Sequence, residues 1–153
     1  MTIVAVDDEK KALETLASAI REAAPEAELH CFRWSEDALA YAEKSHIDVA
    51  FLDVAMPGAN GVQLAQHMAL YQPKINIVFA TGFGEYRDSA FDLHASGYLM
   101  KPITAEKVRV ELDHLRYPVR SRRRIQVRAF GNFEVFLDGK PMEFKYRRTK
   151  ELF

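Results

Sequence analysis

At 153 residues, the chain is long enough to bury one complete domain and part of a second. Hydrophobic residues make up 48% and charged residues 28%, as in ordinary soluble globular proteins, and no run approaches the roughly 18 apolar residues of a membrane helix. There is no basic segment followed by an apolar run at the N-terminus, and Cys31 is the only cysteine. We therefore expect no secretory signal, no internal disulfide and no membrane partner, and a cytoplasmic location.

The near-neutral net charge of −1 hides two segments of opposite charge. Residues 1–115 hold 10 basic and 18 acidic side chains, whereas residues 116–153 hold 11 basic and 4 acidic side chains. Such a split suggests two modules with different partners, of which the basic one would face nucleic acid.

Five short apolar runs alternate with amphipathic stretches over residues 1–115, and each run is expected to form a strand: 2–6, 27–32, 49–52, 75–80 and 97–100. Between the runs, apolar residues recur at helical spacing, as in Leu13, Leu16 and Ile20. Five strand–helix repeats predict an α/β domain, doubly wound around a five-stranded parallel sheet. The stretch 83–94 is the least clear helix, because Gly82 and Gly84 loosen its start.

The first apolar run ends in two adjacent carboxylates, Asp7 and Asp8, which repel each other. An ordinary interpretation is that the strand emerges into water and that Asp8 caps the following helix. In an open parallel sheet, however, functional side chains gather at the carboxyl ends of the strands. The other expected strand ends supply Asp53, Thr81 and Lys101 at the same edge.

Three clustered acids without a cation would be destabilising, and a hard divalent cation such as Mg²⁺ removes this repulsion because it prefers oxygen ligands. Each residue alone has an ordinary explanation: a cap or turn for Asp53, a strand end for Thr81 and a solvated charge for Lys101. Their joint occurrence at the correct strand ends favours a metal site.

Four motifs resemble those of the receiver domain of two-component response regulators: VDDE at 6–9, DVAMPGANG at 53–61, FATG at 79–82 and GYLMKP at 97–102. The resemblance spans about residues 1–115 and implies a flavodoxin-like fold. It also implies that a sensor histidine kinase phosphorylates Asp53 in a Mg²⁺-dependent reaction. The implied magnesium ligands are Asp7, Asp8, Asp53 and the backbone carbonyl of Ala55.

The resemblance further implies that Thr81 and Lys101 bind phosphoryl oxygens, that Tyr98 is the aromatic switch residue, and that a cis peptide precedes Pro102. As Thr81 moves towards a phosphorylated Asp53, Tyr98 would rotate inward into the vacated space. The face from the fourth strand to the fifth helix would then carry the signal and is the favoured surface for a homodimer.

Two positions beside the expected phosphorylation site are apolar, Ala55 and Phe83, whereas related domains carry polar residues there that orient water. We therefore expect a long-lived acyl phosphate.

Residues 116–124 predict a basic linker, in which Arg120, Arg122, Arg123 and Arg124 could contact backbone phosphates without selecting a sequence. Residues 125–153 predict a β-hairpin, a short third strand over 142–144 and the first turns of a helix over 146–153. This segment resembles the start of the winged-helix DNA-binding output domain of SARP-type transcription regulators. Because the segment that reads bases would follow it, we expect a fragment of a longer regulator with weak, salt-sensitive DNA affinity. A hairpin of some other small β-module is the alternative.

Other function classes remain open beside a phosphorylation-controlled transcription regulator. A phosphatase or phosphotransferase of the haloacid-dehalogenase type would carry its nucleophile after the first strand, with a second Asp two residues later, and the adjacent pair Asp7 and Asp8 disfavours it. A phosphorelay or protein-interaction receiver module without DNA binding is disfavoured only by the basic linker and the hairpin. We expect no enzyme activity beyond the chain's own Mg²⁺-dependent aspartyl phosphorylation and dephosphorylation.

Overall fold

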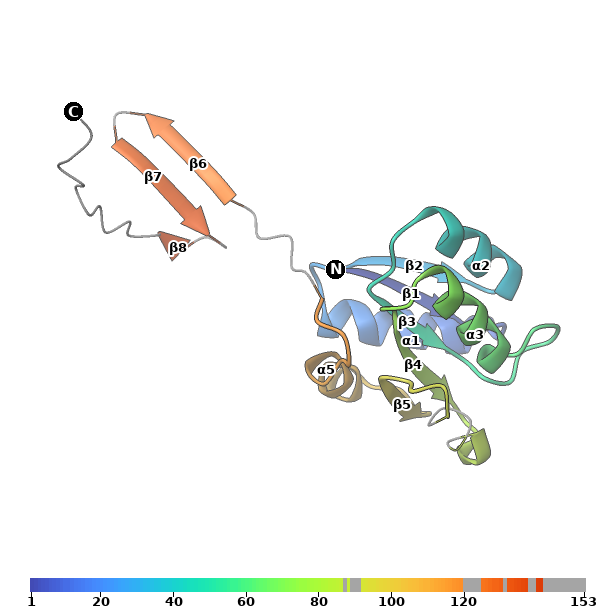
Figure 1. Ribbon diagram of the computed structural model, residues 1–153. Helices are drawn as coiled ribbons and strands as arrows, with labels where there is room; N and C mark the ends of the chain where they lie inside the picture. The colour runs from blue at the N-terminus through green and yellow to red at the C-terminus, as the bar shows by residue number, and fades with distance from the viewer. Residues whose placement is uncertain (87, 89–91, 120–124, 131, 138–139, 142–153) are drawn as a thin grey trace. The chain divides into compact units, whose positions relative to one another are not determined.

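The computed structural model describes residues 1–86, 88, 92–119, 125–130, 132–137 and 140–141 (Figure 1). The chain divides into two compact units, Met1–Arg120 and Ser121–Phe153. Residues 116–119, which the sequence places in a linker, therefore belong to the first unit. Within the described part of the chain, every helix is too short or too polar to span a bilayer.

A five-stranded parallel sheet forms the centre of the first unit, with its strands in the order β2-β1-β3-β4-β5. The order is the flavodoxin-like one, and it confirms the predicted fold. The strands are β1 (Thr2–Val6), β2 (Glu28–Phe32), β3 (Val49–Leu52), β4 (Asn76–Thr81) and β5 (Gly97–Met100).

Helices cover both faces of this sheet, because right-handed crossovers place a helix on one face when the chain moves from β1 to β2 and on the other face when it moves back through β3 and β4 (Figure 1). Helices α1 (Lys10–Ala23) and α5 (Ala105–Asp113) pack on one face, where their apolar side chains meet Ile3 and Phe51. Helices α2 (Ser35–Lys44) and α3 (Gly61–Tyr71) pack on the other, against Val4 and Leu52. The side chains of successive strand residues thus pack into the cores on opposite faces of the sheet, because side chains alternate along a pleated strand.

The start of α1 differs from the ordinary interpretation of the Asp pair. Its N-cap residue is Glu9, whose side chain makes no capping hydrogen bond. Instead, a carboxylate oxygen of Asp7 accepts a hydrogen bond of 2.9 Å from the backbone N–H of Glu9. The interpretation of Asp8 as the helix cap is therefore wrong, because the N-cap position falls on Glu9 and the carboxylate that bonds to its backbone belongs to Asp7.

The stretch 83–94, the least clear helix in the sequence, begins with a single 3₁₀ turn, η1 (Gly84–Tyr86). Residues 87 and 89–91 lie outside the described residues. The stretch ends at His94, whose φ of 54° lies in the left-handed region and turns the chain into β5.

The second unit contains an antiparallel sheet in the order β6-β7-β8, formed by β6 (Ile125–Phe130), β7 (Asn132–Leu137) and β8 (Lys140–Pro141). The register places Ile125 opposite Leu137 and Val127 opposite Val135, so the apolar alternation of the two strands coincides. This confirms the predicted hairpin. The expected strand over 142–144 and helix over 146–153 lie outside the described residues.

Candidate functional site

Three carboxylates meet at the carboxyl edge of the sheet. Asp7 and Asp8 follow β1, and Asp53 follows the neighbouring β3. One oxygen from each carboxylate lies within 4.8 Å of the others. Asp7 is 1% and Asp53 5% exposed, so both carboxylates are almost fully removed from water. The parallel register of β1 and β3 therefore brings Asp53 together with acids that lie 46 and 45 residues before it in the chain.

Lys101, directly after β5, supplies the positive charge of this cluster. Its Nζ lies 2.7 Å from Oδ2 of Asp7 and 3.4 Å from Oδ1 of Asp53. Burial lowers the pKa of Lys101, but the hydrogen bond to Asp7 and the charges of Asp53 and Asp7 outweigh it, so the pKa is raised overall. The ammonium therefore stays charged at neutral pH. The peptide bond between Lys101 and Pro102 is cis, which confirms the expectation of a cis peptide before Pro102.

The carboxyl group of Asp53 ionises at an energetic disadvantage. Burial raises the pKa of its carboxyl group most and Asp7 raises it further, whereas the charge and hydrogen bond of Lys101 and a hydrogen bond with Thr81 lower it. The net pKa is raised, because one ammonium does not compensate for burial beside a second carboxylate. An additional cation at this position would stabilise the ionised form.

The donor set fits Mg²⁺. Carboxylate oxygens are the ligands that this ion takes in small number, while it keeps several of its waters. Asp8 is only half-buried and Ala55 is exposed, which leaves the cluster open to water on that side.

Thr81, Phe83 and Tyr98 form a connected group beside the carboxylates. The backbone N–H of Phe83 donates to Oγ1 of Thr81 at 3.3 Å, and the Tyr98 hydroxyl donates to the carbonyl of Phe83. The Tyr98 ring packs 6.5 Å from that of Phe79, centre to centre. Tyr98 in β5 is thus tied to the loop that leaves Thr81, while the Phe83 side chain is 50% exposed.

The loop after Asp53 is shaped by residues that motif reading did not assign to the site. Gly61 packs so closely that an added Cβ would lie 2.8 Å from the carbonyl carbon of Asp53. Its N–H donates to the carbonyl of Val54 at 3.0 Å, and Asn60 and Gln63 form a capping box that fixes the start of α3. The glycine stands in the quoted motif DVAMPGANG, so its position was visible in the sequence although its contact was not.

Arg33, at the end of β2, is a second residue that sequence reasoning missed. Its Nε and Nη2 donate to the backbone carbonyl of Asp8 at 3.2 and 2.9 Å, and its guanidinium lies 5.3 Å from the ring centre of Trp34. No pattern in the sequence signals a side chain that bonds to a carbonyl 25 residues away.

The structure thus brings Asp7, Asp8, Asp53, Thr81 and Lys101 together at one edge and connects Tyr98 to them. The roles of these residues stay predictions. Arg120, Arg122, Arg123 and Arg124 lie outside the described residues.

Residues 3–113 match the family described as the response regulator receiver domain. The chain belongs to this family. Receiver domains are signalling modules, and apart from Thr2 the match covers the five strands of the sheet and its helices. The comparisons support the receiver domain but not the SARP-type output domain expected over residues 125–153.

Three known proteins show how this receiver domain compares with its relatives. It is 31% identical to the transcriptional regulatory protein YpdB of Escherichia coli over 115 residues, which are 75% of this chain and 47% of that protein. The chain therefore spans less than half of that relative. The response regulatory domain of MrkE from Klebsiella pneumoniae is 31% identical with a TM-score of 0.68, covering 75% of this chain and 94% of that one. The response regulator TrrA of Thermotoga maritima, in complex with Mg²⁺-BeF, shares the fold with a TM-score of 0.65 at 24% identity, covering 73% and 96%.

Proposed function

We propose that this receiver domain accepts a phosphoryl group on Asp53 from a sensor histidine kinase, in a Mg²⁺-dependent reaction, and controls transcription through a DNA-binding region of a longer protein. The observation that carries the proposal is the acidic cluster, in which Asp7, Asp8 and Asp53 offer oxygens within 4.8 Å of one another. Lys101 lies beside two of these acids. The complex of TrrA with Mg²⁺-BeF supports magnesium as the cofactor.

In the proposed reaction, a carboxylate oxygen of Asp53 attacks the phosphorus of a kinase phosphohistidine. The new O–P bond forms as the P–N bond breaks, and the leaving imidazole takes up a proton. Such transfers depend on positioning and on neutralising charge. Lys101 neutralises charge on the phosphoryl oxygens, and Thr81 donates its hydroxyl to one of them. Mg²⁺ held by Asp7, Asp8, Asp53 and the carbonyl of Ala55 would supply further positive charge to the transferring group.

The transcriptional part of the proposal rests on the relatives. YpdB is named a transcriptional regulatory protein, and this chain covers only 47% of it. DNA would therefore be a partner of the full-length protein, and a phosphorelay module without DNA binding is the alternative. A salt titration tests the DNA affinity expected of this chain: we expect weak binding that falls steeply with salt, whereas tight, sequence-selective binding would contradict this expectation.

Asp53→Asn tests the phosphorylation site. With Mg²⁺ and acetyl phosphate, we expect the unaltered chain to gain the mass of one phosphoryl group and Asp53→Asn to gain none, because an amide oxygen is a poor nucleophile. Intact-mass spectrometry measures the mass gained by each chain. Size-exclusion chromatography of the same samples tests whether phosphorylation produces a dimer.

Asp37→Asn is the matched control, because Asp37 lies exposed in α2 and is not a member of the cluster. It should be labelled like the unaltered chain. Equal labelling of Asp53→Asn, or labelling without Mg²⁺, would contradict the proposal.

Ala55→Asn tests the expected long life of the acyl phosphate. Ala55 is exposed and presents no polar group to attacking water, so the phosphorylated chain should release phosphate over minutes or longer. An asparagine at this position would orient that water, and we expect release to become several-fold to about tenfold faster. Phosphate release from purified phosphoprotein measures this rate.

Ala59→Asn, in the same loop but further from Asp53, should leave the release rate unchanged. Loss of the phosphoryl group within seconds from the unaltered chain would refute the long-lived state.

A further inference from the structure

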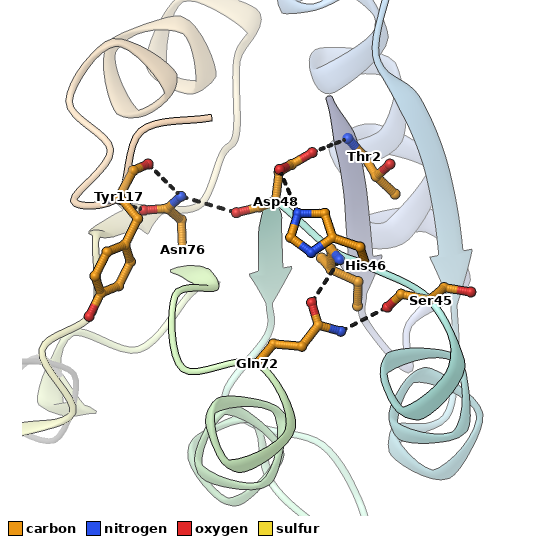
Figure 2. Close-up of polar contacts among 8 residues, drawn as sticks. Thr2, Ser45, His46, Asp48, Gln72, Asn76 and Tyr117 are labelled. Atoms are coloured by element: carbon orange, nitrogen blue, oxygen red, sulfur yellow. Dashed lines mark hydrogen bonds and ion pairs between the residues drawn. The ribbon is translucent and has the colours of Figure 1, made fainter. Parts of the chain in front are cut away.

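A buried asparagine lies at the edge of the sheet opposite to the acidic cluster. Asn76 opens β4 and is 1% exposed. Figure 2 shows its amide between Asp48 and Tyr117. Nδ2 donates to the carbonyl of Asp48 at 3.1 Å and to that of Tyr117 at 3.0 Å. Oδ1 accepts from the N–H of Tyr117 at 2.8 Å and from Oγ of Ser96 at 2.9 Å. Every donor and acceptor of this amide is thus used.

The chain that leaves α5 is held at this point. Both backbone groups of Tyr117 bond to Asn76, as described above. Arg116 donates from Nη1 to the carbonyl of His94 at 3.3 Å, and its guanidinium lies 5.5 Å from the ring centre of Tyr117. Leu115 and Val119 pack against the apolar core below α1 and α5. Residues 115–119 are therefore docked on the receiver domain.

The same amide holds the loop before β5. Ser96, which donates to Asn76, also donates its N–H to the carbonyl of Ile77 at 2.7 Å. This loop lies at the end of the stretch that begins after Thr81. The following strand, β5, carries Tyr98, whose hydroxyl donates a hydrogen bond to the carbonyl of Phe83. Asn76 thus connects the chain after α5 with a loop whose other end lies at the acidic cluster.

We propose that Asn76, His94, Ser96, Arg116 and Tyr117 form a linker clamp that transmits the state of the acidic cluster to the chain that leaves α5. A displacement of β5 moves Ser96, changes its bond to Oδ1 of Asn76, and alters the hold of Asn76 on both backbone groups of Tyr117. The clamp in the resting chain is independent of the proposed function, whereas its response to phosphorylation rests on that function.

Amide hydrogen exchange at Tyr117, measured by NMR, tests the clamp in the resting chain. Asn76→Ala removes both bonds to Tyr117, and we expect its amide to exchange roughly 10- to 30-fold faster. Gln72→Ala is the matched control (Figure 2), since Gln72 makes three similar bonds at this edge, to Ile47, Ala42 and Ser45, with none to Tyr117.

The Val78 amide of each variant corrects for global stability. If the Tyr117 amide exchanges no faster in Asn76→Ala than in Gln72→Ala, the clamp is overturned. If Asn76→Ala does not fold, the unaltered chain alone is decisive, because an unprotected Tyr117 amide would overturn the clamp and a protected one supports it.

Mg²⁺ with beryllofluoride tests the transmission. We expect the exchange rate of the Tyr117 amide to change at least about threefold in the unaltered chain. This change is smaller than the one expected from complete loss of a hydrogen bond. Ser96→Ala should remove this response, because it detaches the loop from Asn76.

The fluorescence of Trp34, the single tryptophan, reports ligand binding independently. Trp34 stacks with Arg33, and Arg33 bonds to the carbonyl of Asp8 in the acidic cluster.

Each outcome distinguishes the proposals. Binding without a change at Tyr117, or an unchanged response in Ser96→Ala, overturns the transmission and leaves the proposed function standing. Absence of binding contradicts the proposed function and the transmission with it, while the resting-state result still decides the clamp.

Discussion

Lys101→Met should lower the free energy of unfolding by about 2–3 kcal/mol at pH 7 without Mg²⁺. The substitution leaves the carboxylates of Asp7, which is 1% exposed, and Asp53, which is 5% exposed, without their ammonium partner. The value is below that for a fully buried pair, because the Lys101 side chain is 28% exposed. Urea unfolding of both chains measures the difference.

The loss should depend on pH in a defined direction. The pKa of Asp53 is already raised above its ordinary value, chiefly by burial, and Lys101 opposes that rise. Without Lys101 the pKa rises further, so the destabilisation is small at acid pH and grows as the pH rises through the folded-state pKa of Asp53. Mg²⁺ should recover most of the lost stability, since it restores positive charge to the cluster.

Lys107→Met is the matched control. Among the described residues, the Lys107 side chain donates only to the carbonyls of Met100 and Pro102, at 3.1 and 2.8 Å, and it lies nearby on α5. Its loss should change the free energy of unfolding by less than about 1 kcal/mol, with no acid-range pH dependence. A Lys101→Met chain as stable as this control would show that the acids do not depend on the ammonium.

Gly61→Ala should lower the free energy of unfolding by about 3 kcal/mol. An added Cβ would lie 2.8 Å from the carbonyl carbon of Asp53 and 3.0 Å from Cα of Val54. Both are backbone atoms, so a rotamer change cannot relieve the overlap. Because the shift would displace Asp53 itself, we also expect weaker Mg²⁺ binding, measured by Trp34 fluorescence.

Gly82→Ala is the control for this substitution, because a Cβ at Gly82 would meet no atom of the described part of the chain within 4 Å. It should change the free energy of unfolding by no more than about 0.5 kcal/mol. Equal stability of the two variants would mean that the loop after Asp53 tolerates a side chain at position 61.

The sheet and the acidic cluster were predictable because both depend on pattern. Buried parallel strands are continuous apolar runs, and the residue after each run must lie at one common edge. Asp7, Asp53 and Lys101 could therefore be placed together before any distance was known. The resemblance to receiver domains added the cis peptide before Pro102, which the structure also has.

Side chains that bond to distant backbone groups were not predictable. The ordinary interpretation of Asp8 as the cap of α1 was wrong, since local capping preference does not reveal that the Asp7 carboxylate accepts a hydrogen bond from the N–H of Glu9. Asn76 opens an apolar strand, and its partner Tyr117 is 41 residues away. Such contacts depend on where the elements pack, which one sequence without its fold does not specify.

The most direct measurement is a crystal structure of the chain with Mg²⁺ and beryllofluoride. The account predicts one magnesium ion bound by carboxylate oxygens of Asp7, Asp8 and Asp53 and by the carbonyl of Ala55. The fluoride complex should be joined to a carboxylate oxygen of Asp53, with Lys101 and Thr81 on its fluorides. An ion at another place, or a beryllofluoride group on a different side chain, would contradict it.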